Sequence, residues 1–169
     1  MNKGWLVALA GKASDATRVI SAGLAAWRAT EATMCVPFYL SCLATVYMQL
    51  SQFEDAQRAI SEAITMTEKT SETWFEAEIH RVAGEIALKS PEGVAKAEAY
   101  FQHSLSVARA QQAKSWELRT AVSLAQLRRD QGKRDEARVV LIPVYARFAE
   151  GFDTRDLKEA KALLDELAQ

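Results

Sequence analysis

The sequence of 169 residues is 49% hydrophobic and 25% charged, and its formal net charge is −1. This composition excludes a disordered chain, and the near-neutral charge argues against a nucleic-acid-binding protein. Good helix formers dominate, whereas there are only 7 Gly and 3 Pro, which predicts long helices and short loops in one domain over residues 1–169. No apolar run approaches the about 18 residues of a membrane span, so no membrane segment is expected.

The hydrophobic periodicity predicts a succession of helices along the whole chain. They are expected at residues 2–11, 13–30, 34–50, 53–70, 73–89, 92–111, 115–131, 134–149 and 155–168. Ser90 followed by Pro91 is typical of an N-cap and a first helical residue. Gly132 and Gly151 indicate helix ends. Pro143 falls inside a predicted helix and is expected to kink it.

Similar residues recur at intervals of 40 or 41 positions. Two series consist of small residues and two of larger apolar residues: Gly4, Ala44, Gly84 and Ala125; Ala16, Ala56, Ala97 and Ala137; Ile20, Ile60, Phe101 and Leu141; Leu24, Ile64, Leu105 and Tyr145. A constant offset over four copies indicates repeated helix pairs. The small residues allow the two helices of a pair to cross closely.

The second unit resembles the tetratricopeptide repeat (TPR) in the order and spacing of seven residues: Leu40, Leu43, Ala44, Tyr47, Ala56, Ile60 and Ala63. The other units match less fully, and the period of about 40 exceeds the usual 34. The resemblance implies an all-α fold, a right-handed α-solenoid of about four TPR-like helix pairs. These repeats are expected at residues 1–30, 34–70, 73–111 and 115–149.

The two ends of the predicted solenoid differ. Residues 155–168 carry an apolar stripe opposite a charged face, as a capping helix requires; the stripe is Leu157, Ala160, Leu163, Leu164 and Leu167. At the other end Gly4 already occupies the small-residue position, so the first helix is short and Trp5 is expected to be exposed. Either the chain is part of a longer protein, or this end forms a homodimer through Trp5.

A narrower resemblance covers residues 68–85, 108–119, 143–148, 150–154 and 156–160. These stretches are similar to the C-terminal TPR region of bacterial adenylate/guanylate cyclases or regulators that carry an AAA-type ATPase module. The resemblance implies a cytoplasmic, regulatory or sensing role in signal transduction. The phosphate-binding sequence G-x-x-x-x-G-K-[ST] does not occur in the chain, so only the repeat module is represented.

The first helix of each TPR pair lines the concave face, and its polar side points into the groove. Carried over by position, the partner-binding residues are Phe38, Ser41, Thr45, Met48, Glu78, Arg81, Glu85, Arg119, Gln126 and Arg129. The arginines suggest a protein or peptide partner with an acidic or C-terminal carboxylate group. Alternatively, Glu78, Arg81, Glu85 and Arg119 neutralise one another as a solvated ion-pair lattice. A small molecule held in the groove is a second functional hypothesis.

No catalytic residue, cofactor or metal ligand is predicted. Cys35 and Cys42 are too far apart on one helix for a disulfide, and free thiols fit a reducing compartment. A metal site would need more Cys or His nearby, and His80 and His103 are far away in sequence. His80 is expected to be at least half-buried and His103 solvated. Trp74 and Trp116 occupy equivalent positions and are expected to pack on the preceding unit, or else to line the groove.

Overall fold

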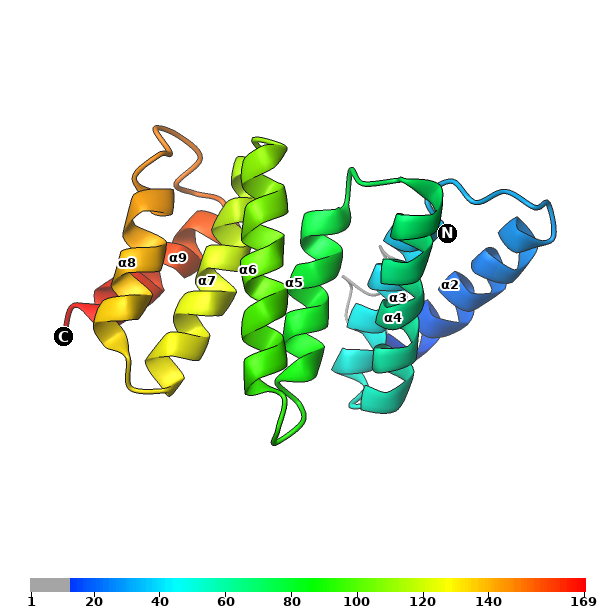
Figure 1. Cartoon of the computed structure of the whole chain (residues 1–169), viewed down its shortest axis with the longest axis horizontal. Helices are drawn as coiled ribbons and strands as arrows, with labels where there is room; N and C mark the ends of the chain where they lie inside the picture. Colours follow the sequence, from blue (N-terminus) through cyan, green and yellow to red (C-terminus); the bar gives the residue numbers. More distant parts are fainter. Residues whose placement is uncertain (1–12) are drawn as a thin grey trace.

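The computed structural model describes residues 13–169, which form eight α-helices and no strand. The helices are α2 (Ala13–Arg28), α3 (Val36–Gln49), α4 (Phe53–Thr70), α5 (Glu76–Ala87), α6 (Val94–Ala110), α7 (Lys114–Asp130), α8 (Arg134–Tyr145) and α9 (Arg155–Leu167). They follow one another along the long axis of the molecule from α2 to α8, and α9 lies against α7 and α8 (Figure 1). The predicted helix 2–11, with Gly4 and Trp5, lies outside the described residues.

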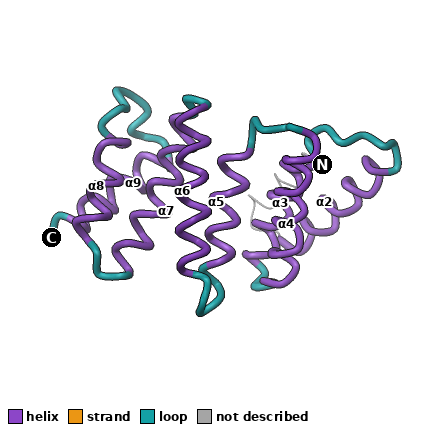
Figure 2. The backbone as a smooth tube through the Cα atoms, viewed as in Figure 1, coloured by secondary structure: helices purple, strands orange, loops and turns teal. Residues whose placement is uncertain are grey.

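Successive helices are antiparallel, and their loops alternate between two edges of the molecule (Figure 2). The helices form two rows, an inner and an outer one. In the inner row, α3 packs on α5, α5 on α7 and α7 on α9. In the outer row of α2, α4, α6 and α8, no neighbouring helices pack on one another to a comparable extent. The inner helices are therefore closer together than the outer ones. No helix within residues 13–169 is both long and apolar enough to cross a membrane.

The periodic residues form the interior of this array. Fully buried side chains recur at the predicted interval, namely Ala16, Ala56, Ala97 and Ala137 together with Ile20, Ile60, Phe101 and Leu141. The crossing positions Ala44, Gly84 and Ala125 are buried as well. The predicted solenoid of helix pairs is confirmed. The interval of 40 or 41 residues seen in the sequence is the interval at which buried core residues recur.

The residues that face each other at the crossings compensate in size. The unit of α3 and α4 combines Ala44 with Ile60, whereas the unit of α5 and α6 combines Gly84 with Phe101. A Cβ atom on Gly84 would lie 2.7 Å from Cδ1 and 2.9 Å from Cζ of Phe101. Glycine is therefore required here by the larger aromatic ring rather than by the backbone conformation.

Helix α9 occupies the inner-row position that follows α7 and also packs on α8. Its predicted apolar stripe is buried at Leu157, Ala160, Leu163 and Leu167, while Leu164 is half-buried. The capping role expected of residues 155–168 is confirmed, because this stripe covers the last helix pair and the charged face remains exposed.

Two local predictions differ from the structure. Helix α6 begins at Val94 with Gly93 as its N-cap, so Ser90 and Pro91 lie in the preceding turn and do not start the helix. Gly93 lies so close to the carbonyl group of Ala87 that no side chain fits there, which fixes the turn.

Helix α8 ends at Tyr145, two residues after Pro143 and four before the predicted end. Proline has no N–H to continue the helical hydrogen bonds.

Candidate functional site

The predicted partner-binding residues lie on the inner helices α3, α5 and α7, but they are not equally accessible. Ser41 is only 2% exposed, and its hydroxyl donates to the carbonyl oxygen of Phe38 at 2.8 Å. Thr45 is half-buried and donates in the same way to Ser41 at 3.0 Å. The expectation that Ser41 faces the groove is therefore wrong, because its side chain is buried and bonded to its own helix. Met48 and Phe38 are half-buried.

A charged network joins α5 to α7 at the middle of the inner row. Arg81 donates to both carboxylate oxygens of Glu78, at 2.8 Å each, and also pairs with Glu85. Ser123 of α7 donates to Glu85 at 3.1 Å, and Arg119 lies 3.6 Å from Glu78. The alternative interpretation of mutual neutralisation is correct in its pairing.

Only part of this network is solvated, however, since Glu85 and Arg119 are partly exposed whereas the other two members are covered. Glu78 is 7% exposed, and the Arg81 side chain is nearly as well covered. Burial on its own lowers the pKa of Arg81, but the hydrogen bonds and negative charges of Glu78 and Glu85 outweigh it, so the pKa is raised above its usual value. Removal of either partner would leave a buried charge, which costs several kcal/mol. Arg81 and Glu78 therefore hold the inner row together and are poorly placed to contact a partner.

The polar residues of α7 are matched by acidic residues of α9. Arg119 donates to Asp156 at 2.7 Å, Gln126 to Glu159 at 3.4 Å and Arg129 to Glu166 at 3.0 Å. Arg129 also pairs with its neighbour Asp130. In the described inner-face network, three arginines (Arg81, Arg119 and Arg129) thus face six carboxylates, namely Glu78, Glu85, Asp130, Asp156, Glu159 and Glu166. Within this described network the carboxylates therefore outnumber the arginines, even with Arg134, which donates to the backbone carbonyl of Glu166.

An aromatic row lies where the inner helices begin. The ring of Trp74 is 5.5 Å from Phe38 and 5.2 Å from Phe75, and Trp116 is 5.5 Å from Phe75. Each tryptophan therefore packs on the preceding unit, as predicted. Trp74 nevertheless remains 45% exposed, and Met34, just before α3, is also exposed. The Trp74 indole donates to Glu72 at 2.8 Å, and Glu72 accepts the backbone N–H of Cys35, which ties two units together.

The two histidines are neighbours in space, a proximity that the sequence reasoning missed. The rings of His80 on α5 and His103 on α6 are 4.2 Å apart, and His103 Nε2 lies 3.3 Å from Glu76 Oε1. Burial, and next the charge of His103, lower the pKa of His80 to about 4. His103 is half-exposed, as expected for a solvated side chain, but it also contacts His80 and Glu76. A separation of 23 residues is bridged because α5 and α6 are the two antiparallel arms of one pair.

Comparison with known proteins bears on the fold. No family model matches the chain, and no curated protein matches its sequence. Among solved structures, the chain is similar to the putative kinesin light chain of Podosopora anserina with nearly identical TPR-like repeats. The TM-score is 0.71 at 16% identity, over 99% of this chain and 90% of that chain. The fold is a TPR-like helical repeat. At this identity the likeness describes the architecture alone.

A second buried carboxylate of the TPR-like array was also missed. Glu117, at the start of α7, is 3% exposed. It accepts hydrogen bonds from Arg109 at 2.9 Å and from Arg147 at 2.5 Å. These arginines come from α6 and from the loop before α9, so Glu117 connects three elements. No sequence signal distinguished it from the other acidic residues, because its burial depends on how the units stack.

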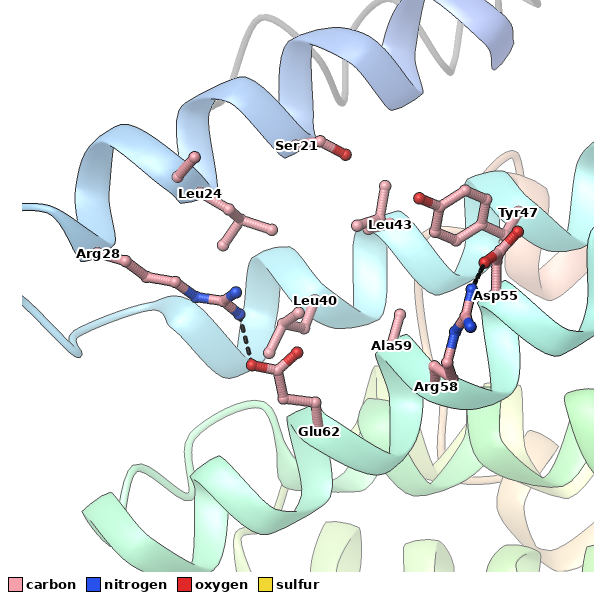
Figure 3. Close-up of a pocket in the computed structure, with 11 residues that line it drawn as sticks. Ser21, Leu24, Arg28, Leu40, Leu43, Tyr47, Asp55, Arg58, Ala59 and Glu62 are labelled. Carbon is pink, nitrogen blue, oxygen red and sulfur yellow. Dashed lines mark hydrogen bonds and ion pairs between the residues drawn. The ribbon is translucent and has the colours of Figure 1, made fainter.

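Within residues 13–169, two hollows of the TPR-like array lie away from the inner-face network. The first, of about 260 Å³, lies between α2, α3 and α4, with Leu40, Leu43 and Tyr47 on its α3 side (Figure 3). Arg28 pairs with Glu62 at 2.6 Å, and Asp55 pairs with Arg58 (Figure 3). The second, of about 460 Å³, lies between the start of α4 and the end of α5, next to Phe53 and Ile86. The first hollow is smaller than the usual volume of a ligand site, about 300–1,000 Å³, whereas the second lies near the lower end of that range.

Proposed function

We propose that this TPR-like array is a non-catalytic scaffold that binds a protein or peptide partner on its inner face. The observation that carries the proposal is the continuous inner row from α3 to α9, whose charged side chains are held in place by buried or cross-helix ion pairs. A surface that is already ordered loses little conformational entropy on binding. The partially exposed Trp74 at its edge supplies the type of aromatic anchor that is enriched at interfaces.

The charge of the inner face determines which partner fits best. Asp156 and Glu166 of α9 already pair with Arg119 and Arg129, so an acidic peptide would have to displace them. The surplus of carboxylates attracts a basic segment, which would also associate faster at low salt. We therefore favour a partner with Lys or Arg residues over the acidic partner that the sequence suggested.

A pair of charge reversals with equal net charge tests this proposal. Glu159→Lys with Glu166→Lys changes the exposed inner face of α9, whereas Glu54→Lys with Glu68→Lys makes the same change on the exposed outer helix α4. We expect the α9 variant to weaken binding of a labelled lysine- and arginine-rich peptide, and the α4 variant to bind as the unchanged protein does. Fluorescence anisotropy measures the Kd, and circular dichroism checks folding. Equal effects of the two variants, or none, would refute inner-face recognition.

The role of the partner site is inferred from the resemblance over residues 68–160. We infer that the array regulates or senses within a bacterial signalling protein in the cytoplasm, where the thiols Cys35 and Cys42 stay reduced. The test is the genomic sequence around the gene. A cyclase or AAA-type ATPase domain encoded in the same or the adjacent reading frame is expected, and unrelated neighbours would contradict this role.

A small-molecule sensor is the second candidate, and the two hollows are the observation that favours it. A ligand that binds only the folded state raises the melting temperature. A thermal-shift screen of metabolites is expected to give a hit that Arg58→Ala abolishes, because Arg58 lines both hollows. A screen without such a hit leaves partner binding as the function.

A further inference from the structure

Three potential metal ligands meet at the start of the third helix pair. One ligand atom each from Glu76, His80 and His103 lies within 4.8 Å of the other two. Glu76 and His80 are four residues apart on α5 and therefore share a face of the helix. His103 approaches from α6, with its ring 4.2 Å from that of His80. These are the only two histidines in the chain.

The environment of His80 provides a second observation. Its Nδ1 atom is buried, and no group of the described protein forms a hydrogen bond with it. A buried polar atom without a partner is costly, and native structures contain few of them. The other described contacts of the ring, with Tyr100 and His103, are between aromatic faces and edges and do not satisfy this nitrogen. The ring is thus held in place while one of its polar atoms lacks a protein partner.

We propose that Glu76, His80 and His103 bind a divalent transition-metal ion, of which Zn²⁺ is the representative. Two imidazole nitrogens and one carboxylate oxygen form a donor set that zinc accepts, with bonds of about 2.0–2.2 Å. Ligand atoms of a tetrahedral site are then about 3.4 Å apart. The ligand atoms, which lie within 4.8 Å of one another, must therefore approach by little more than 1 Å. Rotation of the half-exposed His103 side chain can supply this displacement.

The ion would link α5 to α6 and leave one coordination position for water or for a ligand from outside. Three protein ligands are the arrangement of open zinc sites, whereas closed structural sites use four. The cluster lies across the α5–α6 pair and does not include Arg81, Arg119 or any other member of the inner-face network. Metal binding here is therefore independent of the proposed partner site.

Isothermal titration of the untagged full chain with ZnCl₂ tests the site. One Zn²⁺ per chain is expected to bind and to raise the melting temperature, while MgCl₂, which prefers oxygen ligands, has no effect. His103→Ala removes a half-exposed ligand without disturbing the core and is expected to weaken zinc binding at least about tenfold. Glu76→Gln keeps the shape of the side chain and is expected to act in the same direction.

Cys35→Ser is the matched control, because Cys35 is the more accessible thiol and zinc also binds thiolates. It is expected to leave the zinc affinity unchanged. The proposal is overturned if ZnCl₂ does not bind, if His103→Ala binds it as tightly as the unchanged protein, or if Cys35→Ser is the variant that loses binding.

Discussion

Gly84 and Phe101 are matched in size where α5 crosses α6, and this match makes a specific prediction. Gly84→Ala should destabilise the protein by about 1–3 kcal/mol, since the added methyl group overlaps the fully buried ring. The better helix propensity of alanine returns only about 1 kcal/mol. Urea denaturation measures the change.

A double-mutant cycle identifies the cause. Gly84→Ala together with Phe101→Leu recreates the Ala125 and Leu141 combination of the next unit. The double variant should be more stable than the sum of the two single changes predicts. Strict additivity would show that the ring does not impose the glycine.

The buried thiol of Cys42 should be inert in the folded protein. Burial, and then the negative charge of Glu78, raise its pKa from 9.0 to about 12. The thiolate is the reactive form, so Ellman's reagent at pH 8 should label Cys42 only after unfolding. In Cys35→Ser, where Cys42 is the only thiol, rapid labelling of the native protein would contradict this.

The raised pKa of Cys42 also makes the free energy of unfolding depend on pH. Between about pH 9 and pH 12 the folded protein keeps the Cys42 proton that the unfolded chain loses. Its contribution to the free energy of unfolding is therefore complete below pH 9 and declines as the pH rises through this window. The decline should be smaller in Cys42→Ala, as measured by denaturation at several pH values.

Three short turns between helices use one backbone conformation with different residues. At Ser51, Gln112 and Gly132 the φ angle is positive, and the next residue donates back across the turn at 2.9 Å each time. Only Gly132 adopts this conformation without steric strain. Gln112→Gly should thus stabilise the protein by about 0.5–1 kcal/mol, after allowance for the more flexible unfolded chain.

The reciprocal change is the control. No atom lies within 4 Å of a Cβ built on Gly132, so Gly132→Gln should cost a similar amount through φ alone. The melting temperatures of the two single variants should shift in opposite directions, and the double variant should resemble the unchanged protein. Shifts of the same sign would show that contacts of the side chains control these turns.

The helices and their core could be predicted from the sequence because the 40-residue period is imposed by packing. Ala56, Ala97 and Ala137 are small for the same local reason in every unit. Features that depend on helix rotation and stacking could not be predicted. The burial of Ser41, the pairing of Arg119 with Asp156 and the meeting of His80 with His103 each require the positions of two helices at once.

At the scale of the whole molecule, α9 seals one end of a linear array. Such arrays lose stability locally, because each unit contacts only its neighbours. Leu163→Ala in α9 should cost about 2–5 kcal/mol and should increase hydrogen exchange in α8 and α9. Exchange in α3 and α4 should change much less. Uniform acceleration across the chain would instead show that the array unfolds as one unit.

The ion pair between Arg119 and Asp156 provides the comparison. Both side chains are partly exposed, so Asp156→Asn should cost no more than about 1 kcal/mol and should leave the exchange pattern nearly unchanged. If it matched Leu163→Ala, charge rather than the apolar stripe would hold α9 in place.

The unequal spacing of the two helix rows gives the array a direction in which it bends easily. The inner helices are in continuous contact, whereas the outer helices pack closely on none of their outer neighbours. Opening or closing the outer row therefore changes mainly the packing of α4 on α5 and of α6 on α7, while the inner row acts as the axis of the bend. A partner that spans the inner face would fix this curvature. Because small rotations add from unit to unit, the largest displacement would appear at the two ends, far from the contact itself.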